Sequence, residues 1–179
     1  MKNKTIWSNR FKNKTSQSFQ KIGSSIHIDK RLYEQDIAAS IVHTQMLIKQ
    51  KIIKSEDGNK IISGLKKIKA QIDKGNFEFK EKFEDIHLNI EKALFEIIGP
   101  SAGFLHTARS RNDQVVTDFK LWIKKASIEI IKDISDVMKN LIKKAEKNTD
   151  TVMPGLTHMK NAQPISFAHY LLSYYEMLK

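Results

Sequence analysis

Cysteine is absent from the 179-residue sequence, and this absence excludes several kinds of chemistry. Disulfide bonds, thiol nucleophiles and cysteine-ligated metal sites all need a residue that the chain does not contain, which agrees with a reducing compartment. Long apolar runs are also missing, since none approaches the roughly 18 residues of a membrane-spanning helix. Residues 1–21 are polar and basic and lack the apolar stretch of a signal peptide. We therefore expect a cytoplasmic protein that does not bind a membrane.

Arginine is scarce although the chain is basic. Lysine and arginine together number 31 against 20 acidic residues, a net charge of +11, but the arginines are only Arg10, Arg31, Arg109 and Arg111. The lysines are scattered along amphipathic segments without an aromatic platform for stacking bases, so we expect a solvated lysine face and no nucleic-acid partner. A guanidinium grips a carboxylate with two parallel hydrogen bonds, which lysine cannot do. The pair at 109 and 111 therefore makes residues 108–114 the first candidate site.

Glycine and proline are few, at seven and three residues, and alternating strand-like runs bounded by turns are missing. Apolar residues instead recur at every third or fourth position, which is typical of amphipathic helices. We therefore predict an all-α fold, with an N-terminal helical domain followed by the start of a central bundle of long helices. The expected domains are residues 1–105 and residues 106–179, the second one truncated.

Periodicity and helix-ending residues predict the positions of the helices. Three are expected before the first candidate site, over residues 29–53, 55–75 and 83–98, the last one closed by Gly99 and Pro100. Neither glycine nor proline occurs between Gly103 and Pro154, so one helix of roughly ten turns is expected there, as in a bundle. A loop at Pro154 then leads into a last helix from about Pro164. That helix is apolar nearly all round, so we expect it to be buried.

The richest polar stretch is residues 106–114, HTARSRNDQ, where a loop enters the longest helix. Ser110 and Asp113 match a capping box, which any helix start can use. Capping does not require the arginines, however. Free backbone N–H groups at a helix start attract anions, and two guanidinium groups with the Asn112 amide would add donors suited to carboxylates. Both interpretations, a simple cap and an anion site, stay open on the residues alone.

Two further stretches carry polar side chains. The loop at residues 154–164 displays Thr157, His158 and Lys160, and a histidine there can move a proton near neutral pH or simply lie at the surface. The stretch at residues 84–91 places His87 one turn before Glu91. No metal site is expected, because no second histidine is nearby and cysteine is absent.

Together these stretches resemble the argininosuccinate lyase family of the aspartase and fumarase superfamily. The resemblance covers nearly the whole chain, and the nine-residue HTARSRNDQ block is its most specific part. Six pieces occur in the family's order: WSNRF at 7–11, SIHID at 25–29, RL at 31–32 with EQDI at 34–37, EDIH at 84–87, HTARSRNDQ at 106–114, and PGLTH at 154–158 with AQP at 162–164. The sequence departs from the family at Ser8 and Asn9, where two glycines are usual, and at Lys160, where glutamine is usual.

The resemblance implies the reversible anti β-elimination of argininosuccinate to arginine and fumarate, a step of arginine biosynthesis that needs no cofactor. It implies that His158 assists proton transfer and that Arg111 and Asn112 lie near the substrate carboxylates. The residues that it implies contact argininosuccinate are Ser25, Asp85, His87, Ser110, Arg111, Asn112 and Thr157.

Family members are homotetramers with a central bundle of long helices, and three subunits contribute to each active site. The resemblance implies that the catalytic serine lies on a Gly-Ser-Ser-x-Met-Pro loop, a motif that this sequence does not contain. We therefore expect the chain to be inactive alone. The alternatives are another superfamily lyase acting on a succinyl-type substrate, such as an adenylosuccinate lyase, a non-catalytic crystallin-like homologue, or a basic helical module that binds nucleic acid with strong salt dependence.

Overall fold

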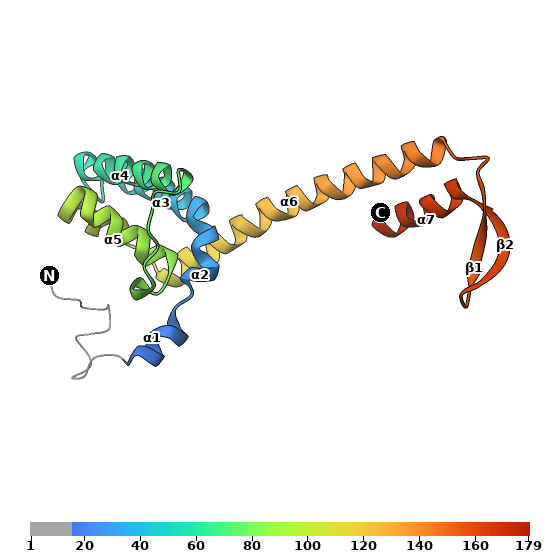
Figure 1. Ribbon diagram of the computed structural model, residues 1–179. Coiled ribbons are helices and arrows are strands. Elements are labelled where there is room, and N and C mark those ends of the chain that lie inside the picture. Colours follow the sequence, from blue (N-terminus) through green and yellow to red (C-terminus); the bar gives the residue numbers. More distant parts are fainter. Residues whose placement is uncertain (1–15) are drawn as a thin grey trace. The chain divides into compact units, whose positions relative to one another are not determined.

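The computed structural model describes residues 16–179 and divides into two compact units, one ending at Trp122 and one covering Ile123–Lys179 (Figure 1). The sequence piece at residues 7–11, with the departures at Ser8 and Asn9, lies outside the described residues. The predicted domain boundary after residue 105 stays a prediction. Among the described residues, no helix has both the length and the apolar character needed to cross a bilayer.

The first unit is helical, and three of its helices lie side by side in Figure 1: α3, α4 and α5. The elements in chain order are α1 (Gln17–Gly23), α2 (Ile26–Asp29), the 3-10 helix η1 (Lys30–Leu32), α3 (Tyr33–Lys49), α4 (Ser55–Asp73), η2 (Glu81–Phe83), α5 (Ile86–Ile98), η3 (Gly99–His106) and the first part of α6 (Arg111–Glu146), which continues past Trp122 into the second unit. The predicted helix over residues 29–53 is therefore confirmed only for α3. Its first turn is split between α2 and η1, and the helix ends at Lys49 rather than at Ile53.

Two helix ends follow directly from local sequence. Gly99 takes a left-handed φ of 67° and its N–H donates to the carbonyl of Phe95, which closes α5 as predicted. At the other end, the Asp85 side chain caps α5 by accepting a hydrogen bond from the N–H of Leu88 at 2.7 Å. The predictions for α4 and α5 are confirmed to within a few residues at each end.

The core of the first unit lies between α3, α4 and α5. Its fully buried side chains are mostly branched aliphatic ones: Ile37, Leu47, Ile61, Leu65, Ile68, Ile86, Ile90 and Leu94. Helices α4 and α5 approach closely at Gly64, where an added Cβ would lie 2.5 Å from Cδ1 of Leu94. A residue without a side chain therefore lets Leu94 fill the space between the two helices.

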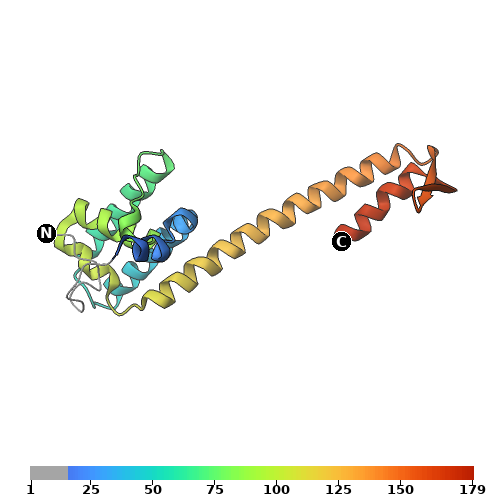
Figure 2. The ribbon, with the colours of Figure 1, turned by 60° about the horizontal axis from the view of Figure 1, so that its bottom comes forward.

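The predicted long helix is confirmed as α6, which has 36 residues (Figure 2). After it the chain forms two antiparallel strands, β1 (Val152–Thr157) and β2 (Lys160–Ser166), and then α7 (Phe167–Leu178). The all-α class is confirmed apart from this hairpin, and the last helix is confirmed but starts at Phe167 rather than at about Pro164. The prediction of a loop at Pro154 is wrong, because Pro154 lies in β1. Ser166 caps α7 by accepting a hydrogen bond from the N–H of His169 at 3.1 Å, so the helix starts only after β2 has ended.

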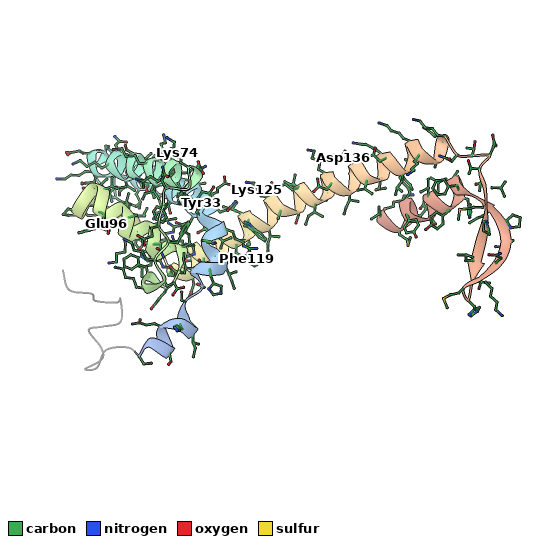
Figure 3. All side chains as sticks on the ribbon, in the orientation of Figure 1. Tyr33, Lys74, Glu96, Phe119, Lys125 and Asp136 are labelled. Carbon is green, nitrogen blue, oxygen red and sulfur yellow. The ribbon has the colours of Figure 1, made fainter. Side chains whose placement is uncertain are left out.

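Within the second unit, α7 packs against the C-terminal part of α6 through one stripe. The buried side chains there are Ala145, Ala168 and Leu171, with Leu141 and Phe167 beside them. The other faces of α7 are open, since Tyr174 is 42% and Met177 71% exposed. The expectation that this helix is buried all round is therefore wrong for the single chain. Figure 3 shows the side chains of α6 pointing away from the helix between the labelled residues Lys125 and Asp136.

Candidate active site

Two of the residues expected to contact substrate, Ser25 and Asp85, lie at the junction where the start of α2 meets the start of α5. Glu84 takes a left-handed φ of 63°, which is strained for a residue with a side chain. Its carbonyl accepts hydrogen bonds from the N–H groups of Ser25 at 2.9 Å and Ile26 at 3.0 Å and from Oγ of Ser24 at 3.2 Å. The two sequence pieces that contain Ser25 and Asp85 are therefore held side by side.

Asp29 closes the same junction. Its Oδ2 accepts a hydrogen bond from Oγ of Ser25 at 2.6 Å, and its Oδ1 accepts one from the N–H of Ile86 at 3.1 Å. Burial, together with the nearby charge of Asp85, raises the pKa of Asp29, although the two hydrogen bonds oppose this. Ser25 directly precedes α2 and Asp29 is its last residue, so the four-residue spacing that brings side chains together along a helix was the available sequence signal. Asp29 thus joins Ser25 and Asp85 as a candidate binding residue that the sequence argument gave no role.

His87 lies deeper, at 2% exposure, and contacts two buried carboxyl groups. Its Nδ1 is 2.9 Å from Oδ1 of Asp36 and 3.5 Å from Oδ2 of Asp118. The side-chain amide of Gln114 donates to the same Oδ1 of Asp36. Burial alone would lower the pKa of His87, but the hydrogen bond and the charge of Asp36 raise it above its ordinary value. Contact with Asp36 therefore favours the imidazolium form of His87.

The two carboxyl groups beside His87 differ in their partners. Burial would raise the pKa of Asp36, but its hydrogen bonds with His87 and Gln114 hold that pKa below its ordinary value. Burial and the charge of Asp36 raise the pKa of Asp118 to about 8. Asp36 is therefore the anion of the pair and Asp118 the neutral acid near pH 7.

The loop before α6 is tied to α3 by two side chains. Arg109 donates from Nη1 to Oγ of Ser40 at 2.9 Å, and Nε2 of His43 is 3.0 Å from the carbonyl oxygen of Thr107. Between them Ala108 takes a left-handed φ of 53°. Burial is the main reason that the pKa of His43 is lowered, so His43 is neutral and can donate to that carbonyl near pH 7. These contacts fix the direction in which the chain enters α6.

At the start of α6, the structure shows a capping contact, whereas the anion site stays a prediction. Ser110 accepts a hydrogen bond from the N–H of Asn112 at 3.2 Å, as a capping residue does. Arg111 forms an ion pair with Glu91, Nη2 to Oε1 at 2.8 Å, and donates from Nη1 to Oε1 of Gln114 at 2.8 Å. Arg111 therefore already holds a carboxylate of the protein, and its role toward a substrate stays a prediction.

A continuous series of polar contacts joins the start of α6 to His87. It runs from Glu91 to Arg111, Gln114, Asp36 and His87, and so crosses α5, α6 and α3. Asp36, Gln114 and Asp118 were given no role from the sequence. The available signal was their placement on core-facing positions: Gln114 and Asp118 are four residues apart on α6, one turn along the same face.

Thr157 and His158 belong to the second unit, at the tip of the hairpin. Thr157 pairs with Lys160 across a two-residue turn, in which His158 and Met159 have φ values of 49° and 59°. Two positive φ angles are typical of a type I′ turn, which usually contains asparagine or glycine. Because neither occurs here, the sequence had no turn signal. Thr157 and His158 are both exposed, and their expected roles stay predictions.

The described residues include one group with the geometry for a metal ion, formed by Asp36, His87 and Asp118, whose ligand atoms lie within 4.8 Å of one another. The contacts of this group fit hydrogen bonds better than metal coordination. Oδ1 of Asp36 accepts a hydrogen bond from the side-chain amide of Gln114, and an amide nitrogen is a hydrogen-bond donor rather than a metal ligand. The expectation of no metal site stays a prediction.

Comparison with known proteins decides the family, since a family model described as lyase matches residues 9–179. The chain belongs to this lyase family. The lyase chain is 57% identical over 175 residues, 98% of its length, to a protein of Pelagibacter ubique named argininosuccinate lyase. It is 50% identical over 179 residues to a protein of the same name from Ehrlichia chaffeensis, which covers the whole chain. It spans 38% of the length of both relatives.

Solved structures agree with this assignment. The crystal structure of an EDDS lyase in complex with formate superimposes on 93% of the lyase chain with a TM-score of 0.70 and 27% identity, which is 33% of that protein. A structure of a fumarate lyase from Mesorhizobium covers 94% of the chain with a TM-score of 0.65 at 17% identity, which supports the fold. The expected superfamily fold is therefore confirmed.

Proposed function

We propose that the chain functions as part of an argininosuccinate lyase, the enzyme that cleaves argininosuccinate into arginine and fumarate. The observation that carries the proposal is the junction at Glu84, which holds Ser25 and Asp29 against Asp85 at the end of the helix that carries His87. Relatives of that name at 48–57% identity over almost the whole chain support the same substrate.

Argininosuccinate offers carboxylates and a guanidinium to these groups. Asp29 and Asp85 are acceptors for guanidinium N–H groups, and the Ser25 hydroxyl can either donate or accept. His87 as an imidazolium and the free N–H groups at the start of α6 suit carboxylates. In our proposal Ser110, Arg111 and Asn112 bind on the carboxylate side, where Arg111 exchanges Glu91 for the substrate.

The proposed reaction is an anti β-elimination. A base takes the proton from the carbon beside a carboxylate, and the electron pair left behind forms an aci-carboxylate with an additional negative charge. This charge collapses to the carbon–carbon double bond of fumarate while the C–N bond breaks and the nitrogen, after gaining a proton, leaves as the guanidinium of arginine. Donors aimed at the aci-carboxylate stabilise it more than the substrate, and this difference is what accelerates the reaction. Thr157 would bind substrate, and His158 would assist one of the proton transfers.

The remaining features of the proposal follow the family resemblance. We propose a homotetramer in the cytoplasm, without cofactor, membrane or nucleic-acid partner. Because the catalytic serine motif of the family is not in this sequence, we expect no fumarate release from the chain alone. The second candidate is a lyase that acts on another substrate, supported by the 27% identity to an EDDS lyase.

A chimera tests the proposal. The 175 aligned residues of the Pelagibacter ubique relative are replaced by this chain, and fumarate release from argininosuccinate is followed by its ultraviolet absorbance. We expect the chimera to be active and His158→Asn to lower kcat by roughly 100-fold or more, as for loss of a general acid or base. His169→Asn, an exposed histidine with no expected role, is the matched control. A folded chimera that cleaves a different succinyl compound but not argininosuccinate would favour the second candidate.

A further inference from the structure

Asp118 is a buried acid that the proposed reaction does not use. It is 0% exposed, and neither of its carboxyl oxygens has a hydrogen-bond donor among the described residues. An ionised carboxylate without donors is strongly disfavoured in a protein interior. One ligand atom each of Asp36, His87 and Asp118 lie within 4.8 Å of one another, and two neighbouring carboxyl groups can share a hydrogen bond only if one of them carries a proton.

The contacts decide which of the two carries that proton. Asp36 accepts from the ring of His87 and from the amide of Gln114, both of which stabilise a negative charge. Asp118 has neither of these donors at hydrogen-bond distance, since His87 Nδ1 is 3.5 Å away. With Asp118 neutral, Asp36 negative and His87 positive, the cluster has no net charge, and the two Asp118 oxygens that lack donors carry no buried negative charge. Two ionised carboxylates in the same space would repel each other.

We propose that Asp118 is a positioning residue, whose proton is donated to Asp36 so that Asp36 remains the single buried anion facing His87. Asp36 then holds Nδ1 of His87 and keeps the ring an imidazolium, which leaves Nε2 to meet a ligand. The link to catalysis rests on the proposed role of His87 toward substrate, but the protonation of Asp118 does not.

Other charged groups also face the cluster. The carboxylate of Asp85, at the cap of α5, favours the charged form of His87, and the guanidinium of Arg109 favours ionisation of Asp118. Both remain in every variant used below. The differences between variants therefore report Asp36 and Asp118 alone.

The test is a carboxyl-carbon NMR titration of the full chain labelled at its aspartates. We expect one carboxyl carbon to titrate near or above pH 7, against about 3.9 for ordinary aspartate, and its signal to be missing in Asp118→Asn. Finding that this signal belongs to Asp36, or that all aspartates titrate below about pH 5, would overturn the proposal.

The second measurement follows His87 by imidazole NMR, its signal assigned from its loss in His87→Gln. Asp118→Asn keeps a neutral donor to Asp36, so the His87 midpoint should stay above that of an ordinary histidine. Asp36→Asn removes the anion from a buried ring, so the midpoint should fall by roughly one pH unit or more. If Asp36→Asn does not fold, the Asp118→Asn titration decides, because a His87 midpoint below that of an ordinary histidine contradicts the proposal.

The same samples separate a proton from a metal ion. Titration with Zn²⁺ should leave the Asp118 and His87 signals unchanged if a proton fills the cluster. Stoichiometric binding that shifts both signals and is lost in Asp118→Asn would assign the three residues to a metal site and refute the proton-sharing arrangement. None of these measurements requires enzymatic activity, so a failure of the proposed lyase function would leave their outcome interpretable.

Discussion

The protonation of Asp118 predicts how the stability of the first unit changes with pH. In the unfolded chain this carboxyl ionises near its ordinary pKa of 3.8, whereas in the folded protein its pKa is about 8. Between these values the native state holds a proton that the unfolded state has released. The contribution of Asp118 to stability is therefore fully present below pH 3.8 and is lost as pH rises toward 8.

The size of the effect follows from these two pKa values. Each pH unit between them lowers the free energy of unfolding by about 1.4 kcal/mol. From pH 6 to pH 8 the loss is about 2 kcal/mol rather than the full two-unit value, because Asp118 is about half ionised at pH 8. His87, whose pKa is also raised, further lowers the free energy of unfolding as the pH rises above 6.5, the ordinary pKa of histidine. Comparison with Asp118→Asn removes this second contribution, since His87 is present in both proteins.

The assay is urea unfolding at pH 6, 7 and 8, followed by far-ultraviolet circular dichroism. We expect the wild-type chain to lose about 2 kcal/mol more than Asp118→Asn between pH 6 and pH 8. Asp133→Asn, at an exposed position of α6, should keep the full wild-type pH dependence. Equal pH dependence in wild type and Asp118→Asn would mean that Asp118 is not protonated in the native state, and the reasoning would be wrong.

Three further predictions concern packing, capping and the helix start. Leu94→Ala, at a side chain that is 0% exposed, should lower the free energy of unfolding by about 3 kcal/mol in urea titrations; a loss below about 1 kcal/mol would mean that the site collapses around the cavity. Asp85→Ala should cost about 1 kcal/mol by removing the cap of α5, whereas Asp85→Asn should cost less because asparagine also caps; equal losses would contradict a capping role. In the chimera, Arg111→Lys should raise KM for argininosuccinate by roughly tenfold, since lysine cannot form the two-pronged contact, and an unchanged KM would show that Arg111 serves Glu91 alone.

Local signals predicted the helices of the first unit well. Helices α4 and α5 and the 36-residue α6 were expected because three- and four-residue spacing, capping residues and the scarcity of glycine and proline act within a few turns of chain. The left-handed Gly99 is another local effect. The hairpin was missed because its turn, His158 and Met159, uses residues that rarely adopt positive φ. In addition, β1 contains Pro154 and Gly155, which are uncommon inside strands, and the burial of β2 does not alternate.

The candidate site was only partly predictable. The sequence singled out Ser25, Asp85 and His87 through motifs, and the structure places the first two at one junction. The partner of His87 could not be deduced, because Asp36 is 51 residues away along the chain. The two arginines that the sequence suggested as a pair have different partners in the structure. Arg109 donates to Ser40 on α3 and so holds the loop before α6, while Arg111 pairs with Glu91.

By itself, therefore, the sequence determined where the helices lie, which segment begins the longest one and which family its motifs resemble. These properties depend on neighbours within a few turns of the same helix. Only the tertiary structure decided the charge states near His87, because a pKa depends on burial and on every charge brought nearby by folding. Asp36, His87 and Asp118 come from three different helices, and packing those helices together is what makes one aspartate an anion and the other a neutral acid.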